Sequence, residues 1–206
     1  MKFYDVSLPI KKGMIVYPGN PEPSIRLYSS IPHNKVNESL ITLGSHTGTH
    51  VDSRLHIQKD APGVDLIKLS NFFGKSKVLD LTYVKYEIHR EDLENFQIQE
   101  ADIILLKTKN SILGFEDFRK DYVHIKLDAA NYLIEKRVKT LGCDYLSAKK
   151  FGGDEEVHQV LINNLTLFEG LNLADVPEGE YIFIGLPLSI NCDGAPARVI
   201  LIEDWI

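Results

Sequence analysis

Cysteine is scarce in this chain, which argues against a fold held together by disulfides. Only two cysteines occur in 206 residues, Cys143 and Cys192. They lie far apart and belong to no CxxC pattern, an arrangement typical of reduced thiols in a reducing compartment. We therefore expect neither cysteine to form a disulfide or to bind a metal.

Long apolar segments are also absent. No apolar run approaches the ~20 residues that a membrane-spanning helix needs. The first segment, MKFYDVSLPIKKGM, is interrupted by Asp5, Ser7, Pro9 and two lysines, so it lacks the apolar centre of a signal peptide. These absences predict a soluble cytoplasmic protein without a membrane partner.

The chain has fewer basic residues than acidic ones. The chain has 23 Lys and Arg against 29 Asp and Glu, a formal net charge of -6, and it has no long basic run. A protein that binds a phosphate backbone needs a positively charged surface. We therefore expect no nucleic acid partner.

What the sequence does contain fits one globular domain. Hydrophobic residues make up 44% of the chain, enough for a sizeable core, and no repeat, low-complexity tract or linker divides it. We expect a single domain spanning residues 1–206.

The order of the apolar segments predicts an α/β fold. Three early segments rich in β-branched and aromatic residues favour strands joined by turns. From about residue 77, strand patterns alternate with helical patterns. The early strands lie at 2–10, 24–29 and 39–44, the later ones at 77–82, 102–108, 140–143, 166–173, 180–190 and 197–202, and the helices at 90–96, 126–138 and 154–164. We expect a mainly parallel sheet, a second antiparallel sheet and a helical layer.

One stretch concentrates potential metal ligands. GSHTGTHVDSRLHI, residues 44–57, contains three of the seven histidines and one aspartate: His46, His50, Asp52 and His56. A straight strand would point all four to one face, but it would spread them over ~33 Å, whereas ligands lie ~2 Å from their ion. A bend in the polar, turn-forming residues around Gly48 would bring the first three to one centre and leave His56 nearby.

Two imidazoles and a carboxylate suit zinc, manganese or iron, and three protein ligands leave a position open for water. Water on such an ion loses a proton near neutral pH and can then attack a carbonyl. His56 fits a general base and acid, because a free imidazole titrates near ~6.5. The alternative is a polar loop that is merely rich in histidine, since HxxxH alone is a weak signal.

Further ligands would come from elsewhere in the chain. The remaining histidines are candidates, namely His33, His89, His124 and His158. His158 lies in the helical segment 154–164 between apolar residues, and Glu169 ends an apolar strand, where a carboxylate needs a partner. Taken alone, both residues also fit ordinary positions on an amphipathic helix and at the end of a strand.

The sequence resembles the cyclase family of metal-dependent hydrolases, which includes bacterial kynurenine formamidases and isatin hydrolases. The motif HxGTHxDxPxH of that family is similar to HTGTHVDSRLH, residues 46–56, at every position except the proline. Four further segments resemble the family in the same order: VYPGNP, LGCDYLS, VHQVLINNLTLFEGLNL and GLPLSINCDGAPARVIL. The resemblance therefore covers nearly the whole chain.

The resemblance implies a swivelling β/β/α fold, a metal site and a homodimer or homotetramer. It implies that His46, His50 and Asp52 bind one divalent ion, and that Asp52 bridges to a second ion held by His158 and Glu169. His56 matches the general acid/base of the family. Zinc is the expected ion, with manganese and iron as alternatives, at one or two ions per chain.

Two residues depart from the family pattern. Arg54 replaces the usual proline, and it either faces solvent or binds an anionic group of the substrate. Tyr17 stands where similar kynurenine formamidases tend to have tryptophan, and a tyrosine can still stack on an aromatic ring. Both are thus candidate substrate-binding residues.

The implied function is hydrolysis of an amide, formamide or cyclic amide bond in a small molecule, with N-formylkynurenine as one candidate substrate. The alternatives are an isatin hydrolase or lactonase activity, and a metal-binding member of the family without catalysis.

Overall fold

The structure is a computed structural model that describes residues 1–203. Its strands are β1 (Lys2–Asp5), β2 (Ser24–Ser29), β3 (Glu38–Thr42), β4 (His50–Asp52), β5 (Phe73–Asp80), β6 (Glu87–Ile88), β7 (Ile103–Lys107), β8 (His124–Ile125), β9 (Thr140–Cys143), β10 (Thr166–Glu169), β11 (Gly179–Pro187) and β12 (Gly194–Glu203). Its α-helices are α1 (Arg90–Glu94), α2 (Lys109–Leu113), α3 (Leu127–Glu135) and α4 (Glu156–Asn164), and short 3-10 helices cover Arg54–His56, Val64–Leu66 and Leu69–Asn71.

Seven strands close into one barrel in the order β12, β11, β5, β7, β9, β10, β4 and back to β12. The four strands β5, β7, β9 and β10 run parallel to their neighbours within that group. The remaining pairings, through β4, β12 and β11, are antiparallel. β1 adds to the outer edge of β12.

This closure corrects the expected architecture. The α/β class is confirmed, but the expected swivelling arrangement, in which a mainly parallel sheet is separate from a second antiparallel sheet, is wrong. The helices α1, α3 and α4 do cover one side of the barrel. The short strand β4 pairs on one side with β10 and on the other with β12, so the parallel and antiparallel strands form one continuous wall. Apolar periodicity indicates which faces are buried, but it does not indicate which strands pair.

The expected segments themselves form, but several are shorter than expected: the strand at 2–10 ends at Asp5 and the strand at 166–173 ends at Glu169. β9 covers the expected residues 140–143, and the helical pattern at 126–138 becomes α3. The strand β4 and the helix α2 were not expected. Both are short, and three or five residues are too few to show a periodicity.

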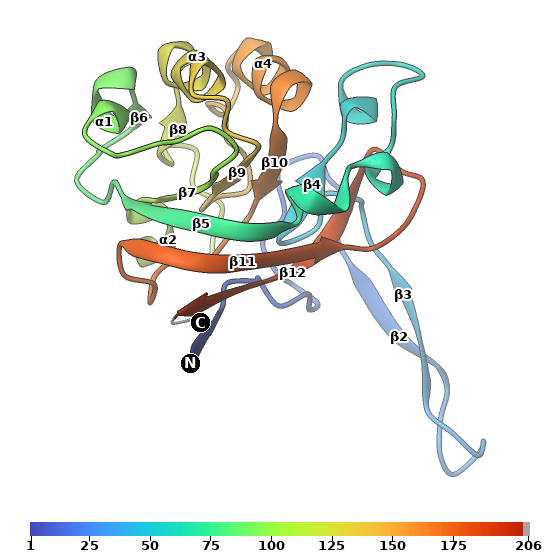
Figure 1. Ribbon diagram of the computed structural model, residues 1–206. Helices are drawn as coiled ribbons and strands as arrows, with labels where there is room; N and C mark the ends of the chain where they lie inside the picture. The colour runs from blue at the N-terminus through green and yellow to red at the C-terminus, as the bar shows by residue number, and fades with distance from the viewer. Residues whose placement is uncertain (204–206) are drawn as a thin grey trace.

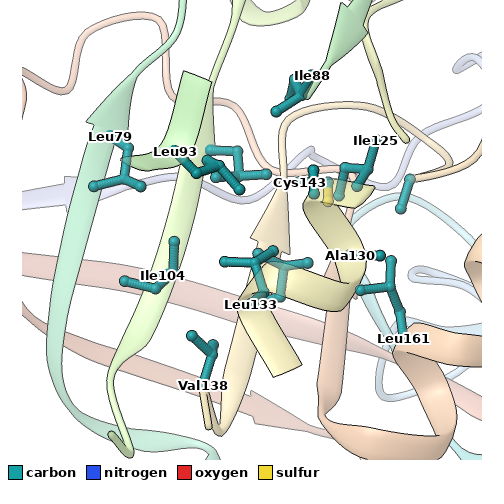
Figure 2. Packing of buried hydrophobic residues seen from close by; sticks show 14 of the residues in the cluster. Leu79, Ile88, Leu93, Ile104, Ile125, Ala130, Leu133, Val138, Cys143 and Leu161 are labelled. Atoms are coloured by element: carbon teal, nitrogen blue, oxygen red, sulfur yellow. The ribbon is translucent and has the colours of Figure 1, made fainter. Parts of the chain in front are cut away.

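Two apolar clusters lie on either side of the wall formed by β7. Ile104 and Leu106 belong to the outer cluster with residues of α1, α3 and α4, while Ile103 and Leu105 belong to the cluster inside the barrel. Figure 1 shows these three helices on one side of the barrel. Figure 2 shows Leu133 of α3 close to Ile104 in the outer cluster. Burial on both faces explains why this strand reads as an uninterrupted apolar run.

The hairpin of β2 and β3 lies outside the barrel. β2 and β3 pair only with each other, and their hairpin projects away from the body (Figure 1). The antiparallel hairpin expected near the start of the chain therefore forms, but as an isolated arm. Across residues 1–203, no helix is both long enough and apolar enough to cross a bilayer.

We expect Leu133→Ala to lower the free energy of unfolding by about 2–5 kcal/mol, because it leaves a cavity in the outer cluster. Leu133 is fully buried, at 0% exposure. The matched control is Leu113→Ala in α2, where the side chain is 57% exposed, and its effect should stay within about 0.5 kcal/mol. Urea unfolding monitored by circular dichroism measures both, and equal losses would contradict this assignment of the core.

Candidate metal centre

The residues of the histidine-rich stretch meet because the chain bends twice. Gly48 adopts φ +65°, and a Cβ there would come within 3.2 Å of Met14, so a glycine suits this turn. Next come the strand β4 and, directly after it, the 3-10 helix Arg54–His56. As a result, the ring of His46 lies 5.0 Å from that of His50 and 4.1 Å from that of His56. The predicted bend is confirmed.

Asp52 lies at the centre of the cluster. His46 Nδ1 donates to Asp52 Oδ1 at 2.7 Å, and His158 Nε2 donates to Asp52 Oδ2 at 3.0 Å. His50 Nε2 lies 3.4 Å from Asp52 Oδ1. Burial opposes ionisation of this carboxyl, but the hydrogen bonds from His158 and His46 hold its pKa well below the usual range. Asp52 is therefore an ionised carboxylate inside the barrel wall.

Glu169 contributes a second buried carboxyl. It ends β10 directly opposite His50 of β4, and its oxygens lie 3.6 Å from His50 Nε2 and 3.7 Å from His158 Nε2. The backbone N–H of Ala148 donates to it at 2.6 Å. Burial, and then the nearby charge of Asp52, raise the pKa of Glu169 to about 8. Two carboxyls in one buried site call for a cation between them.

The cluster fits a divalent metal by the chemistry of its donors. Two groups of three residues offer one ligand atom each with all atoms within 4.8 Å of one another, His46–Asp52–His56 and His50–Asp52–Glu169. Asp52 belongs to both groups, which suits a carboxylate shared between two ions. Nitrogen and oxygen donors of this kind accept zinc, manganese or iron. The structure thus brings together all five expected ligands, and it adds His56 to one of the groups.

His56 is the most exposed imidazole of the cluster, with 32% of its side chain accessible. Its ring lies 5.4 Å from that of His158. Burial lowers its pKa, although the charge of Asp52 works in the opposite direction. His56 is therefore a neutral base at neutral pH, at the open side of the cluster.

Asp193 belongs to the site and was not predicted. It accepts a hydrogen bond from His46 Nε2 at 2.8 Å and one from His56 Nδ1 at 3.4 Å. Partial burial opposes ionisation, but hydrogen bonds from Cys192 and His46 hold the pKa of Asp193 well below its usual range. The C-terminal segment that resembles the family contains this residue, but no spacing links it to His46, which lies 147 positions earlier.

Tyr17 and Arg54 lie in different places. Tyr17 lines the pocket above the cluster, and its ring lies 5.5 Å from that of Phe118 and 5.8 Å from that of Phe151. Arg54 is exposed, donates from Nη2 to the carbonyl of Asn163 at 2.7 Å, and lines a neighbouring depression. The structure therefore brings Tyr17 to the histidine pocket but not Arg54.

The pocket above the cluster has a volume of about 220 Å³. Besides Tyr17 and the histidine and carboxyl groups, it is lined by Asn20, Leu146, Ser147, Lys149 and Glu155. Sites for drug-sized ligands are commonly ~300–1,000 Å³, so this pocket lies below that range and suits a small molecule.

Comparison with known proteins identifies the family. Residues 4–150 match the Cyclase family model. The chain belongs to the Cyclase family. The matched region contains the stretch 44–57 in full, whereas His158 and Glu169 lie beyond it.

Relatives and solved structures of the family cover nearly the whole chain. A kynurenine formamidase of Bacillus cereus is 27% identical over 204 residues, which is 97% of each chain. A solved structure described as a predicted metal-dependent hydrolase from Bacillus stearothermophilus is 37% identical, with a TM-score of 0.86 over 97% of each chain. Isatin hydrolase A from Labrenzia aggregata is 22% identical, with a TM-score of 0.82 over 97% of this chain and 93% of that one, and shows the same fold.

We expect Gly170→Ala to destabilise the protein by about 2–4 kcal/mol, because it combines backbone strain with overpacking. Gly170 has φ +72°, and a Cβ there would lie 2.5 Å from the carbonyl oxygen of Gly48. Since Gly170 follows Glu169 and packs against the backbone of Gly48 and Thr49, directly before His50, zinc affinity should fall as well.

The matched control is Gly152→Ala, which has φ +67° but no atom within 4 Å of the added Cβ. It should destabilise the protein only by the backbone strain, about 1–2 kcal/mol, and leave zinc affinity unchanged. Thermal unfolding and zinc titration measure both effects. Equal losses in the two variants would show that the close approach to Gly48 is unimportant.

Proposed function

We propose that this chain is a metal-dependent hydrolase of C–N bonds other than peptide bonds, and that it cleaves a small aryl formamide or cyclic amide. The observation that carries the proposal is the buried carboxylate of Asp52 among His46, His50 and His158, with the half-exposed His56 beside it. Family membership and the kynurenine formamidase relatives support a hydrolase of this type.

The residues assigned to the metal are His46, His50, Asp52, His158 and Glu169. We propose zinc, with manganese and iron as alternatives and one or two ions per chain, because the nitrogen and oxygen donors suit all three. When bound, a divalent ion there supplies a Lewis acid for the substrate carbonyl and lowers the pKa of water.

His56 is assigned the proton transfers. Its lowered pKa leaves it neutral and able to accept a proton from the attacking water. Asp193 accepts from Nδ1 of His56, which orients the ring and leaves Nε2 to carry the proton to the leaving nitrogen. Asp193 is thus a positioning residue, and Tyr17 provides a flat wall for an aromatic ring.

N-Formylkynurenine is the first substrate to test, because the kynurenine formamidase relatives match the whole length of the chain. Isatin and small lactones are the alternatives. A metal-binding protein without catalysis is a second candidate, because His56 also belongs to a donor group with His46 and Asp52. A small-molecule substrate and a cytoplasmic location stay predictions.

Metal analysis of the purified protein, together with hydrolysis assays on N-formylkynurenine, formanilide, isatin, phthalimide and a small lactone, tests the proposal. Stoichiometric metal and turnover of a formamide or cyclic amide are expected. Stoichiometric metal without turnover of any of these compounds would favour the candidate without catalysis.

His56→Ala and His50→Ala separate the two roles. We expect His56→Ala to keep its metal and to lose about 10²–10⁴-fold in kcat, because it removes the general base. His50→Ala should lose both metal and turnover, because His50 is fully enclosed beside Asp52 and Glu169. The control is His89→Ala, at a partly exposed position outside the site. Loss of metal in His56→Ala would instead make His56 a ligand.

We also propose that the chain forms a homodimer or homotetramer through the hairpin of β2 and β3. An isolated two-stranded hairpin is marginally stable in water, and this one exposes apolar side chains on both faces: Ile25, Leu27, Tyr28, Ile31, Val36, Leu40 and Ile41. Residues 21–42 hold two acidic and two basic residues, so the arm is neutral while the whole chain carries -6. Two such arms can therefore pack together without repulsion.

Leu27→Glu should reduce the mass in solution to that of a monomer, because it places a charge in the apolar surface of the arm. Leu27 is 60% exposed in the single chain. The matched control is Leu69→Glu, at a 76% exposed leucine outside the arm, which should leave the mass unchanged. Light scattering coupled to size-exclusion chromatography measures the mass. An unchanged oligomer in Leu27→Glu would rule out this interface.

A further inference from the structure

Lys149 is a charged residue of the pocket to which the proposed mechanism gives no role. It lies on the loop between β9 and α4 and lines the same pocket as His56 and Tyr17. Only 12% of its side chain is exposed. Enclosing an ammonium to this extent is costly unless it has partners, so its position calls for an explanation.

The backbone around Lys149 is held in place by aromatic residues. The hydroxyl of Tyr122 donates to the carbonyl oxygen of Lys149. Two positions further on, the ring of Phe151 packs 5.2 Å from Phe118 and 5.8 Å from Tyr17. The loop therefore presents Lys149 at a fixed point of the pocket wall, next to the surface proposed to contact an aromatic ring.

The ammonium of Lys149 has unused hydrogen-bonding capacity. An ammonium has three donors, and within residues 1–203 the acceptor it contacts is Glu155. Lys107, which is also enclosed, instead donates to the carbonyls of Ala174 and Val176 and has a structural role. Lys149 therefore keeps donors for a ligand in the pocket.

Glu155 links Lys149 to the metal-binding end of the pocket. One oxygen of Glu155 contacts the ammonium, and the other lies 3.9 Å from His158 Nδ1. Glu155 itself is 56% exposed, so it can move aside when an anion enters. A positive charge therefore lines the same pocket as the candidate metal ligands, and Glu155 stands between it and His158.

We propose that Lys149 binds a carboxylate of the substrate, remote from the C–N bond that is cleaved, and so selects aryl amides that carry an acid group. This inference rests on the proposed function. A charge-assisted hydrogen bond between ammonium and carboxylate is stronger than a neutral one, and it is stronger still in an enclosed pocket. Lys149 is a specificity-determining residue, because its contact is made at a distance from the reacting atoms.

The test compares N-formylkynurenine with its methyl ester, which differ in one negative charge. Lys149→Met should lower kcat/KM about 10- to 100-fold for the acid and leave the ester within about twofold. Lys149→Arg should restore part of the activity on the acid. The matched control is Lys150→Met, at the neighbouring exposed lysine, which lines a different pocket. It should change kcat/KM for neither substrate.

Equal losses on acid and ester, or no loss on the acid, would overturn the role of Lys149. If the wild type cleaves neither compound, N-formylkynurenine is not its substrate, and calorimetry with kynurenine and kynurenine methyl ester then tests Lys149 independently of turnover. Wild-type protein should bind kynurenine, and Lys149→Met should weaken that binding about tenfold or more without weakening ester binding. No binding of kynurenine to the wild type, or equal binding to the variant, would overturn the inference.

Discussion

The enclosed carboxylate of Asp52 links the fold to the site. Its strand, β4, has only three residues, yet it pairs with β10 and with β12 and so closes the barrel. Burying an ionised carboxylate costs several kcal/mol unless partners offset the cost. The partners are His46, four residues before the start of β4, and His158 on α4. The hydrogen bonds that offset the cost of burying Asp52 in the barrel wall are therefore the same contacts that assemble the candidate metal centre.

Much of the fold could be predicted because buried positions are occupied by apolar residues at a regular spacing in the sequence. The strand β7 is apolar at Ile103, Ile104, Leu105 and Leu106, since it has an apolar cluster on each face. The barrel could not be predicted in the same way. Its closure depends on β4, whose three residues include a histidine and an aspartate and resemble a polar loop. Pairing of short strands is decided by contacts between distant segments, which a local pattern does not contain.

In the candidate site, too, some residues could be predicted from local spacing and others could not. His46, His50 and Asp52 could be grouped from spacing, because a bend at Gly48 is a local property of the chain. His158 and Glu169 could be added only through the family resemblance, since a helix and a strand more than 100 positions away bring them to Asp52. Asp193 was missed because its partners His46 and His56 lie 147 and 137 positions away in the sequence. Arg54, by contrast, was a candidate substrate-binding residue, but its contact with Asn163 keeps it out of the pocket.

The unequal burial of the histidines gives the cluster two kinds of imidazole. His50 is fully enclosed, and burial lowers its pKa to about 4, so it is a neutral nitrogen donor facing two carboxyls. His46 is almost as enclosed, but its hydrogen bond to Asp52 outweighs burial and raises its pKa to about 9. His46 therefore carries a positive charge that balances Asp52, and binding of a divalent ion at this nitrogen would require loss of that proton. His56, at the open side, has no such tight partner. The same short stretch of sequence thus supplies both a charge that a metal can replace and a base that remains free to accept a proton.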